Sequence, residues 1–261
     1  MPVNVRSFLD RLSAQGLAHF TTQAAVAALG TSPDAVTTSL RRLREQGRLA
    51  SPARSFHLIV PPEYRKLGCL PPEQFVPDLM RHLGLDYYAG LLTAAHYHGA
   101  AHQAPMVFQV IVAAGRPALT CGKVKVQFVG RQDLTTVPTV ERNTLRGVLR
   151  LSSREATVFD LVGYPGHAGG LSNVATILAE LAEEVDPGKL GQLAAHVPRP
   201  WTQRLGYLLD RVDAPALAEA LMPEARKARE AVPLRAGRAV VDAERDVRWK
   251  VWVNEEVEVD L

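Results

Sequence analysis

Three short helical segments in the first fifty residues constrain the fold more than any other feature of the chain. Each segment is amphipathic and is followed by glycine, which ends helices because it adopts the left-handed conformation at little cost. In the first segment, apolar residues recur at helical spacing before Gly16. These residues are Val5, Phe8, Leu9 and Leu12. The pattern predicts three packed helices at the start of the chain.

The third segment has the strongest start signal. Gly30 ends the helix before it, Thr31 or Ser32 is placed to cap the new helix, and Pro33 follows at its first position. Proline is tolerated there because the N–H that it lacks would have no helical partner. The predicted buried face consists of Val36, Leu40 and Leu43, and Gly47 closes the helix.

The outward face of this third helix carries hydroxyl and guanidinium groups. Its members are Thr37, Thr38, Arg41, Arg42 and Arg44. A helix in the major groove needs small side chains that fit close to the base edges, and arginines that reach guanine or phosphate. We therefore predict that these five residues contact DNA.

A strand pair is predicted directly after the third helix. Phe56, Leu58 and Val60 alternate towards the core, and Leu49 begins the opposing strand. The segment 51–53 is expected to turn, with Arg54 and Ser55 at the tip as further DNA contacts. Three helices and a basic-tipped hairpin are the elements of a winged helix-turn-helix. Any small helical bundle exposes some arginine, so the prediction rests on the combination.

Charge and proline content indicate where the chain divides into domains. Residues 1–66 hold nine Lys and Arg against four Asp and Glu, a net of +5, whereas residues 151–261 hold thirteen against eighteen, a net of −5. The positive end is where a polyanion would dock. Four prolines between residues 61 and 75 mark a boundary. We predict a winged-helix domain over 1–62, a proline-rich linker over 63–72 and a second domain over 73–261.

The second domain is predicted to be a larger mixed α/β structure, which makes the whole chain α+β. Helices are expected over about 73–83 and 87–99, followed by a buried strand in MVFQVIVAA. The next strand is half exposed, because Lys123 and Lys125 alternate with valines. A capping box at 152–155 is expected to open a further helix.

Metal and thiol chemistry have weak support in the sequence. Cys69 and Cys121 are far apart and have no metal-ligand spacing, so we expect core residues in a reducing cytosol. His96, His98 and His102 form a cluster, but on a helix only the last two share a face. We expect neither a metal nor a cofactor.

A nuclease site is the main enzymatic alternative. Glu155 and Asp160 lie five residues apart and would point to different sides of a helix, and Glu155 has a role in the capping box. Lys250 is followed by acidic residues, but not at a spacing that would bring carboxylates and lysine onto one metal. We expect no catalytic residues and a protein that is not an enzyme.

No targeting or membrane segment is evident. The N-terminal stretch MPVNVRSFLDRLSAQG has no apolar core between its charges, and no apolar run reaches transmembrane length. The expected location is the cytoplasm, without membrane association.

Five segments of the body, in this order, resemble the AbiEi antitoxin family. They are GCLPPEQFVPDLMRHLG, YYAGLLTAAHYHGAAHQAPMVFQVIV, LSSREATVFDLVGYPGHAGGLSNVATILAEL, RLGYLLDRV and WKVWVNEEVEVD. The resemblance covers about residues 65–260, and the predicted head fits the N-terminal domain of that family. Any one segment would be weak evidence, but their combination is specific.

The resemblance implies a function. AbiEi antitoxins belong to type IV toxin–antitoxin operons that are associated with abortive phage infection, and they repress their own promoter by binding inverted repeats in double-stranded DNA. Their partner gene encodes a nucleotidyltransferase-like toxin, which is neutralised without stable direct binding. Basic residues of both domains are implicated in DNA contact. By residue type and placement, these correspond here to Arg41, Arg42, Arg54, Lys123 and Lys125.

An interaction protein is the alternative from another class. The acidic C-terminal third would then sequester a basic toxin, whereas the simpler interpretation of that charge is a solvated acidic face.

Overall fold

A computed structural model describes residues 4–100 and 105–259. The chain forms two compact units and passes between them several times. The first unit comprises Met1–Tyr88, Met106–Leu134 and Glu141–Arg150, and the second comprises Ala89–Pro105, Thr135–Val140 and Leu151–Leu261. These units are defined by contacts, whereas the predicted domains were defined as separately folding segments. The predicted boundaries at residues 62 and 72 therefore stay a prediction.

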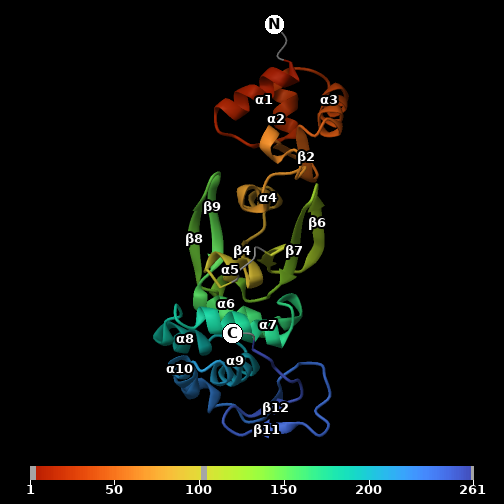
Figure 1. Ribbon diagram of the computed structural model, residues 1–261. Helices are drawn as coiled ribbons and strands as arrows, with labels where there is room; N and C mark the ends of the chain where they lie inside the picture. Colours follow the sequence, from red (N-terminus) through yellow and green to blue (C-terminus); the bar gives the residue numbers. More distant parts are fainter. Residues whose placement is uncertain (1–3, 101–104, 260–261) are drawn as a thin grey trace. The chain divides into compact units, whose positions relative to one another are not determined.

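Residues 4–60 of the first unit, here called the head, have the element order of a winged helix-turn-helix (Figure 1). The elements are α1 (Val5–Ala14), β1 (His19–Thr21), α2 (Thr22–Leu29), α3 (Pro33–Glu45), β2 (Leu49–Ala53) and β3 (Phe56–Ile59). The strands form an antiparallel sheet in the order β1-β3-β2, so that β2 and β3 make a two-stranded wing. With the mixed sheet described below, this confirms the α+β fold class.

Local signals explain why the helices of the head begin and end where they do. The side chains of Thr21 and Ser32 accept hydrogen bonds from the first turns of α2 and α3, at 3.1 and 3.3 Å. Gly30, with φ of 60°, ends α2 in the left-handed conformation. The predicted apolar stripes then meet in one core. Its buried members are Phe8, Leu9, Phe20, Ala25, Leu29, Val36, Leu40, Leu43 and Leu49.

One expectation for the wing is wrong. Residues 51–53 do not turn but continue β2, and the turn is confined to Arg54 and Ser55, with Ala53 paired to Phe56. Pro52 is tolerated in β2 because this strand is at the edge of the sheet, and the register shifts between Ala50 and Ala53. The turn signal of proline was therefore overridden by strand pairing.

A six-stranded mixed sheet follows, most of which lies in the first unit. Its strands are β4 (Tyr87–Ala89), β5 (Phe108–Val112), β6 (Arg116–Cys121), β7 (Val124–Gly130), β8 (Thr139–Thr144) and β9 (Gly147–Ser152), in the order β6-β7-β5-β4-β9-β8. Helix α4 (Val76–Leu83) and three short 3-10 turns, Pro62–Tyr64, Pro72–Gln74 and Leu134–Thr136, accompany it. The helix expected over 87–99 is partly wrong, because residues 87–89 form an inner strand of this sheet.

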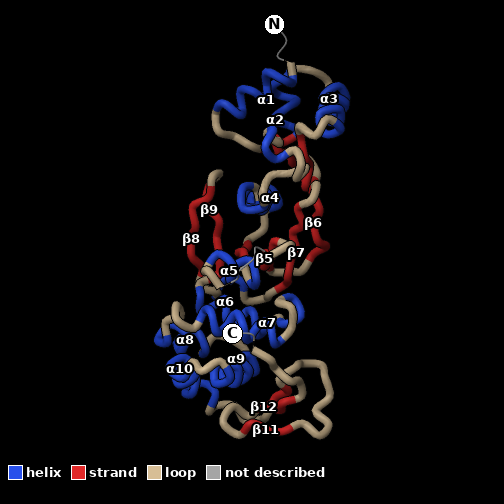
Figure 2. The backbone as a smooth tube through the Cα atoms, viewed as in Figure 1, coloured by secondary structure: helices blue, strands red, loops and turns tan. Residues whose placement is uncertain are grey.

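The second unit is mainly helical and ends in a small sheet (Figure 2). Its helices are α5 (Leu91–Tyr97), α6 (Arg154–Gly163), α7 (Leu171–Leu181), α8 (Pro187–Ala194), α9 (Arg199–Arg211) and α10 (Pro215–Ala225), with a 3-10 turn at Pro165–His167. Strands β10 (Val232–Pro233), β11 (Glu244–Asp246) and β12 (Val251–Val253) pair in the order β10-β12-β11. Residues 155–162 of α6 are all buried, which makes this helix the centre of the unit.

Candidate nucleic-acid interface

The outer face of α3 is the first element of a candidate nucleic-acid interface. Thr37, Thr38, Arg41, Arg42 and Arg44 are all exposed, as the helical pattern predicts, while Val36 and Leu40 are almost completely buried. Thr37, Arg41 and Arg44 follow one line along the helix, and Thr38 and Arg42 follow a neighbouring line. The helix therefore presents small hydroxyl groups in its first half and guanidinium groups in its second half.

Arg41 has an acidic neighbour on the same helix. Its Nε lies 3.8 Å from Oε1 of Glu45, and both side chains are about two-thirds exposed. An exposed ion pair of this kind contributes about 0–1 kcal/mol. A phosphate that approaches Arg41 can therefore replace Glu45 at little cost.

The tip of the wing carries the next two predicted residues. Arg54 and Ser55 are exposed, and Ser55 has the left-handed φ of 58°. The backbone of the tip is held on two sides. Thr22 N donates to Ser55 O at 3.2 Å, and His82 Nε2 donates to Arg54 O at 3.1 Å. The wing is thus anchored to the start of α2 and to the end of α4. The side chain of Arg54 remains accessible.

Strand β2 connects α3 to the β6–β7 hairpin, because it contacts α3 and also β6 (Figure 2). At that second contact the backbone of Ser51 forms a hydrogen bond with the Cys121 thiol. The adjoining turn is fixed by Lys123 N, which donates to Leu67 O at 2.8 Å. Lys123 and Lys125 are exposed on this hairpin.

The predicted DNA contacts therefore lie on three elements of the structure: α3, the wing and the β6–β7 hairpin. We call this set the basic strip. It consists of Thr37, Thr38, Arg41, Arg42, Arg44, Arg54, Ser55, Lys123 and Lys125. All nine side chains are exposed, and six of them are cationic.

His57 is a positioning residue of the wing that the sequence did not single out. Its ring lies between Thr22 Oγ1, 2.9 Å from Nε2, and Ser51 Oγ, 2.8 Å from Nδ1, so it ties both wing strands to the start of α2. Burial, followed by the nearby charges of Arg44 and His82, lowers the pKa of His57 to about 4. The ring is therefore neutral at pH 7. A histidine in a strand gives no sequence signal for such a role.

This lowered pKa predicts how the stability of the head depends on pH. Between pH 6.5 and about 4 the unfolded chain protonates His57 while the folded chain does not, so stability is retained above pH 6.5 and falls as the pH decreases. His57→Gln preserves hydrogen bonding to both hydroxyls but does not titrate. We expect the variant to show a flatter stability profile than the wild type between pH 7 and 4, measured by urea unfolding. Identical profiles would contradict the assignment.

The two cysteines and His98 have structural contacts in the fold. Cys69 and Cys121 are buried as expected, and a hydrogen bond between them, with burial, raises the pKa of Cys69. His98 Nε2 lies 2.8 Å from Ser152 O, whereas His102 lies outside the described residues. Within residues 4–100 and 105–259, no group of three potential ligands is arranged to hold a metal ion.

The carboxylates considered for a nuclease are part of the scaffold. Glu155 accepts hydrogen bonds from Ser153 Oγ at 2.8 Å and from Asp186 N at 3.3 Å. Helix α6 begins where the capping box predicts, but its N-cap is Ser153 rather than the first residue of that box. Asp160 is completely buried on the same helix. None of the helices in the described part of the chain combines the length and the apolar character needed to cross a bilayer.

Comparison with solved structures shows the fold. The "RV2827C protein from Mycobacterium tuberculosis" is similar with a TM-score of 0.68 at 17% identity, over 94% of this chain and 89% of that protein. An "antigenic nucleotidyltransferase-like protein from Paracoccidioides brasiliensis" matches with a TM-score of 0.40 at 13% identity, over 57% of this chain and 89% of that protein. No curated protein matches the sequence.

Comparison with protein families finds a match for the middle part of the chain. Residues 88–211 match the family described as the AbiEi antitoxin C-terminal domain. This region begins in β4, contains the basic β6–β7 hairpin, and ends with α9. The resemblance predicted from the sequence is thereby confirmed for this region, which belongs to the AbiEi antitoxin C-terminal domain family.

Proposed function

We propose that this antitoxin represses its own operon by binding inverted repeats in its promoter through the basic strip. The observation that carries the proposal is the outer face of α3, on which three arginines and two threonines are exposed. The opposite face of this helix packs into the core of the head and holds the helix in place. Arginine and hydroxyl side chains on such a helix are what base edges and phosphates require. Arg54 and the two lysines would then extend the footprint along the backbone of the duplex.

In the same proposal, the partner gene encodes a nucleotidyltransferase-like toxin that the antitoxin neutralises without stable direct binding. Repression would keep the toxin level low, and the protein itself would act as a regulator rather than as an enzyme.

The salt dependence of DNA binding tests the proposal. Each neutralised phosphate releases counterion, so the logarithm of the affinity falls with the logarithm of salt concentration at about 0.9 per contact. Six cations in the strip predict a slope of up to about −5 for a promoter duplex containing the repeats. Mobility-shift titrations between 50 and 200 mM salt, with a scrambled duplex as the control, measure it. Binding that is absent at the lowest salt, or equal for both duplexes, would contradict specific repression.

A second candidate function, sequestration of the toxin, has one structural observation in its favour. In the second unit, Asp210, Glu244 and Asp246 line a cavity of about 370 Å³ together with Arg211. Asp210 is paired with Arg248 at 3.1 Å, so Glu244 and Asp246 are the carboxylates of this lining that a basic protein surface could contact. Co-purification of antitoxin and toxin at moderate salt, lost on Glu244→Gln with Asp246→Asn, would support this function. Separate elution would leave the repressor proposal.

A further inference from the structure

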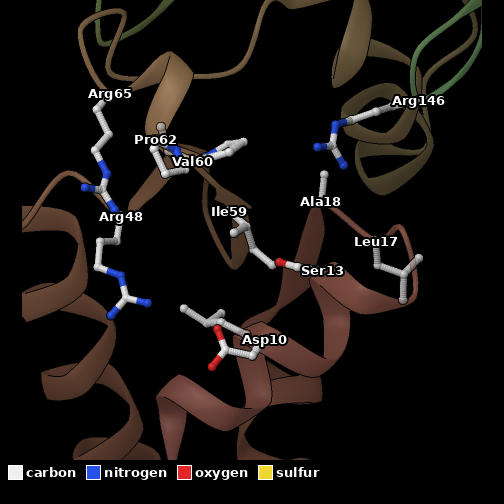
Figure 3. A pocket seen from close by; sticks show the side chains of 12 residues that line it. Asp10, Ser13, Leu17, Ala18, Arg48, Ile59, Val60, Pro62, Arg65 and Arg146 are labelled. Carbon is white, nitrogen blue, oxygen red and sulfur yellow. The ribbon is translucent and has the colours of Figure 1, made fainter.

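A second polar site lies in the first unit, in a cavity of about 350 Å³ (Figure 3). Its lining comes from α1, the α1–β1 loop, the α3–β2 loop, the end of β3, the segment after β3 and the β8–β9 turn. The lining residues are Leu9, Asp10, Ser13, Leu17, Ala18, Arg48, Ile59, Val60, Pro61, Pro62, Arg65 and Arg146. The volume is within the range of small-molecule sites in proteins. None of these residues belongs to the basic strip.

Three guanidinium groups line this cavity without acidic partners. Among the described residues, none forms an ion pair with Arg48 or Arg65. Arg146 is held only by neutral groups, since its Nε donates to Gln74 Oε1 at 3.3 Å and its Nη1 to Gly16 O at 3.5 Å. Arg48 and Arg65 lie on one side of the cavity and Arg146 on the other, with Val60, Pro62 and Ile59 drawn between them (Figure 3). Like charges brought together in this way favour an anionic occupant.

The other lining residues indicate which kind of anionic ligand fits the cavity. Asp10 and Ser13, on one side of α1, offer a carboxylate and a hydroxyl, which are suited to bind hydroxyl groups rather than a bare anion. Leu9, Ile59 and Pro62 supply an apolar surface for a ring. The lining thus combines guanidinium groups for a phosphate, polar groups for hydroxyls and an apolar wall.

We propose that this cavity binds a small phosphate ester that carries free hydroxyl groups, a nucleotide or a sugar phosphate. Arg48 and Arg65 bind the phosphate, Arg146 closes the opposite side, and Asp10 and Ser13 bind the hydroxyls. The proposal does not depend on DNA binding by the basic strip. It gives the antitoxin a ligand site of its own in the unit that contains the head.

Titration calorimetry of the full chain tests the proposal with four probes: AMP, ribose 5-phosphate, inorganic phosphate and adenosine. We expect AMP or ribose 5-phosphate to bind with a Kd below about 1 mM, and whichever is tighter identifies the source of the phosphate. Inorganic phosphate is expected to bind at least about tenfold more weakly, since it lacks the hydroxyl contacts. Adenosine, which has no phosphate, is expected not to bind.

Variants assign the binding to this cavity. Arg48→Gln with Arg65→Gln is expected to weaken ester binding by at least about tenfold, because each guanidinium makes charge-assisted hydrogen bonds. Asp10→Asn should weaken the ester but not inorganic phosphate. The matched control is Arg6→Gln with Arg11→Gln, which removes the same charge from exposed positions of α1 outside the lining and should leave binding unchanged. Unchanged thermal unfolding verifies that each variant is folded.

Three results would overturn the proposal. The first is an absence of binding for both esters at 10 mM in the wild type. The second is unchanged ester binding in a folded Arg48/Arg65 variant. The third is a loss of promoter DNA binding in that variant without any ester binding in the wild type, because these arginines would then serve the DNA backbone. A failure of the wild type to bind its promoter, with ester binding intact, would contradict the repressor proposal alone.

Discussion

Replacing Arg41 and Arg42 together by alanine is expected to weaken binding of the promoter repeats by about a hundredfold or more. Each base-reading contact contributes about 1–3 kcal/mol, and every 1.4 kcal/mol is a factor of ten in affinity. The two side chains are adjacent but lie on different lines of α3, so a duplex seated on the helix meets both. Since their stems are exposed, their removal leaves the core of the head intact.

The control for this pair is Arg226→Ala with Arg229→Ala. These arginines are exposed in the second unit, outside the basic strip, and their replacement removes the same net charge. Competition mobility shifts with specific and scrambled duplexes separate loss of base reading from loss of general attraction. If both double variants bind the repeats like the wild type, α3 does not contact the operator. If both weaken binding equally, net charge rather than the strip is responsible.

Gly122→Ala is expected to lower the free energy of unfolding of the first unit by about 2–4 kcal/mol, through overpacking and backbone strain together. Gly122, between Cys121 and Lys123, has a left-handed φ of 59°. A Cβ there would overlap with the carbonyl oxygen of Leu67 and lie 2.8 Å from Gly68 Cα. Because these are backbone atoms, no side-chain movement relieves the overlap. Urea unfolding followed by circular dichroism measures the effect.

Gly47→Ala is the matched control for backbone strain. Gly47 has a φ of 66°, but no described atom comes within 4 Å of a Cβ built at this position. It is expected to cost only about 1 kcal/mol, the strain of a left-handed alanine. If the two variants are equally stable, the close approach of the Leu67–Gly68 backbone to the β6–β7 turn does not exist. A larger loss for Gly122→Ala supports that approach, which also fixes the backbone of Lys123.

The head was predictable from sequence because its signals are local. A capping hydroxyl, a helical apolar stripe and a following glycine act within a few residues of one another, and they located α1, α2 and α3 closely. The same periodicity determines which α3 side chains are exposed, so the DNA-facing residues of this helix were accessible to reasoning from sequence. The segments that resemble AbiEi antitoxins predicted the family whose C-terminal domain matches residues 88–211.

Where expectations failed, a distant partner decided the local structure. Proline at 52 indicates a turn, but pairing with β3 keeps it in an edge strand. Residues 87–89 were expected to begin a helix, yet Ala89 pairs with Leu151 in the sheet. A short apolar stretch fits a strand or a helix equally well until its neighbours are known.

The sequence by itself determined the three helices of the head, the polar face of α3 and the relationship to AbiEi antitoxins, because each depends on residues close together in the chain. Only the tertiary structure decided how the wing is anchored, through His57 and through His82 against Arg54. It also decided that arginines at 48, 65 and 146 share one cavity. These arginines come together through the packing of segments up to about a hundred residues apart, which local patterns of polarity do not predict.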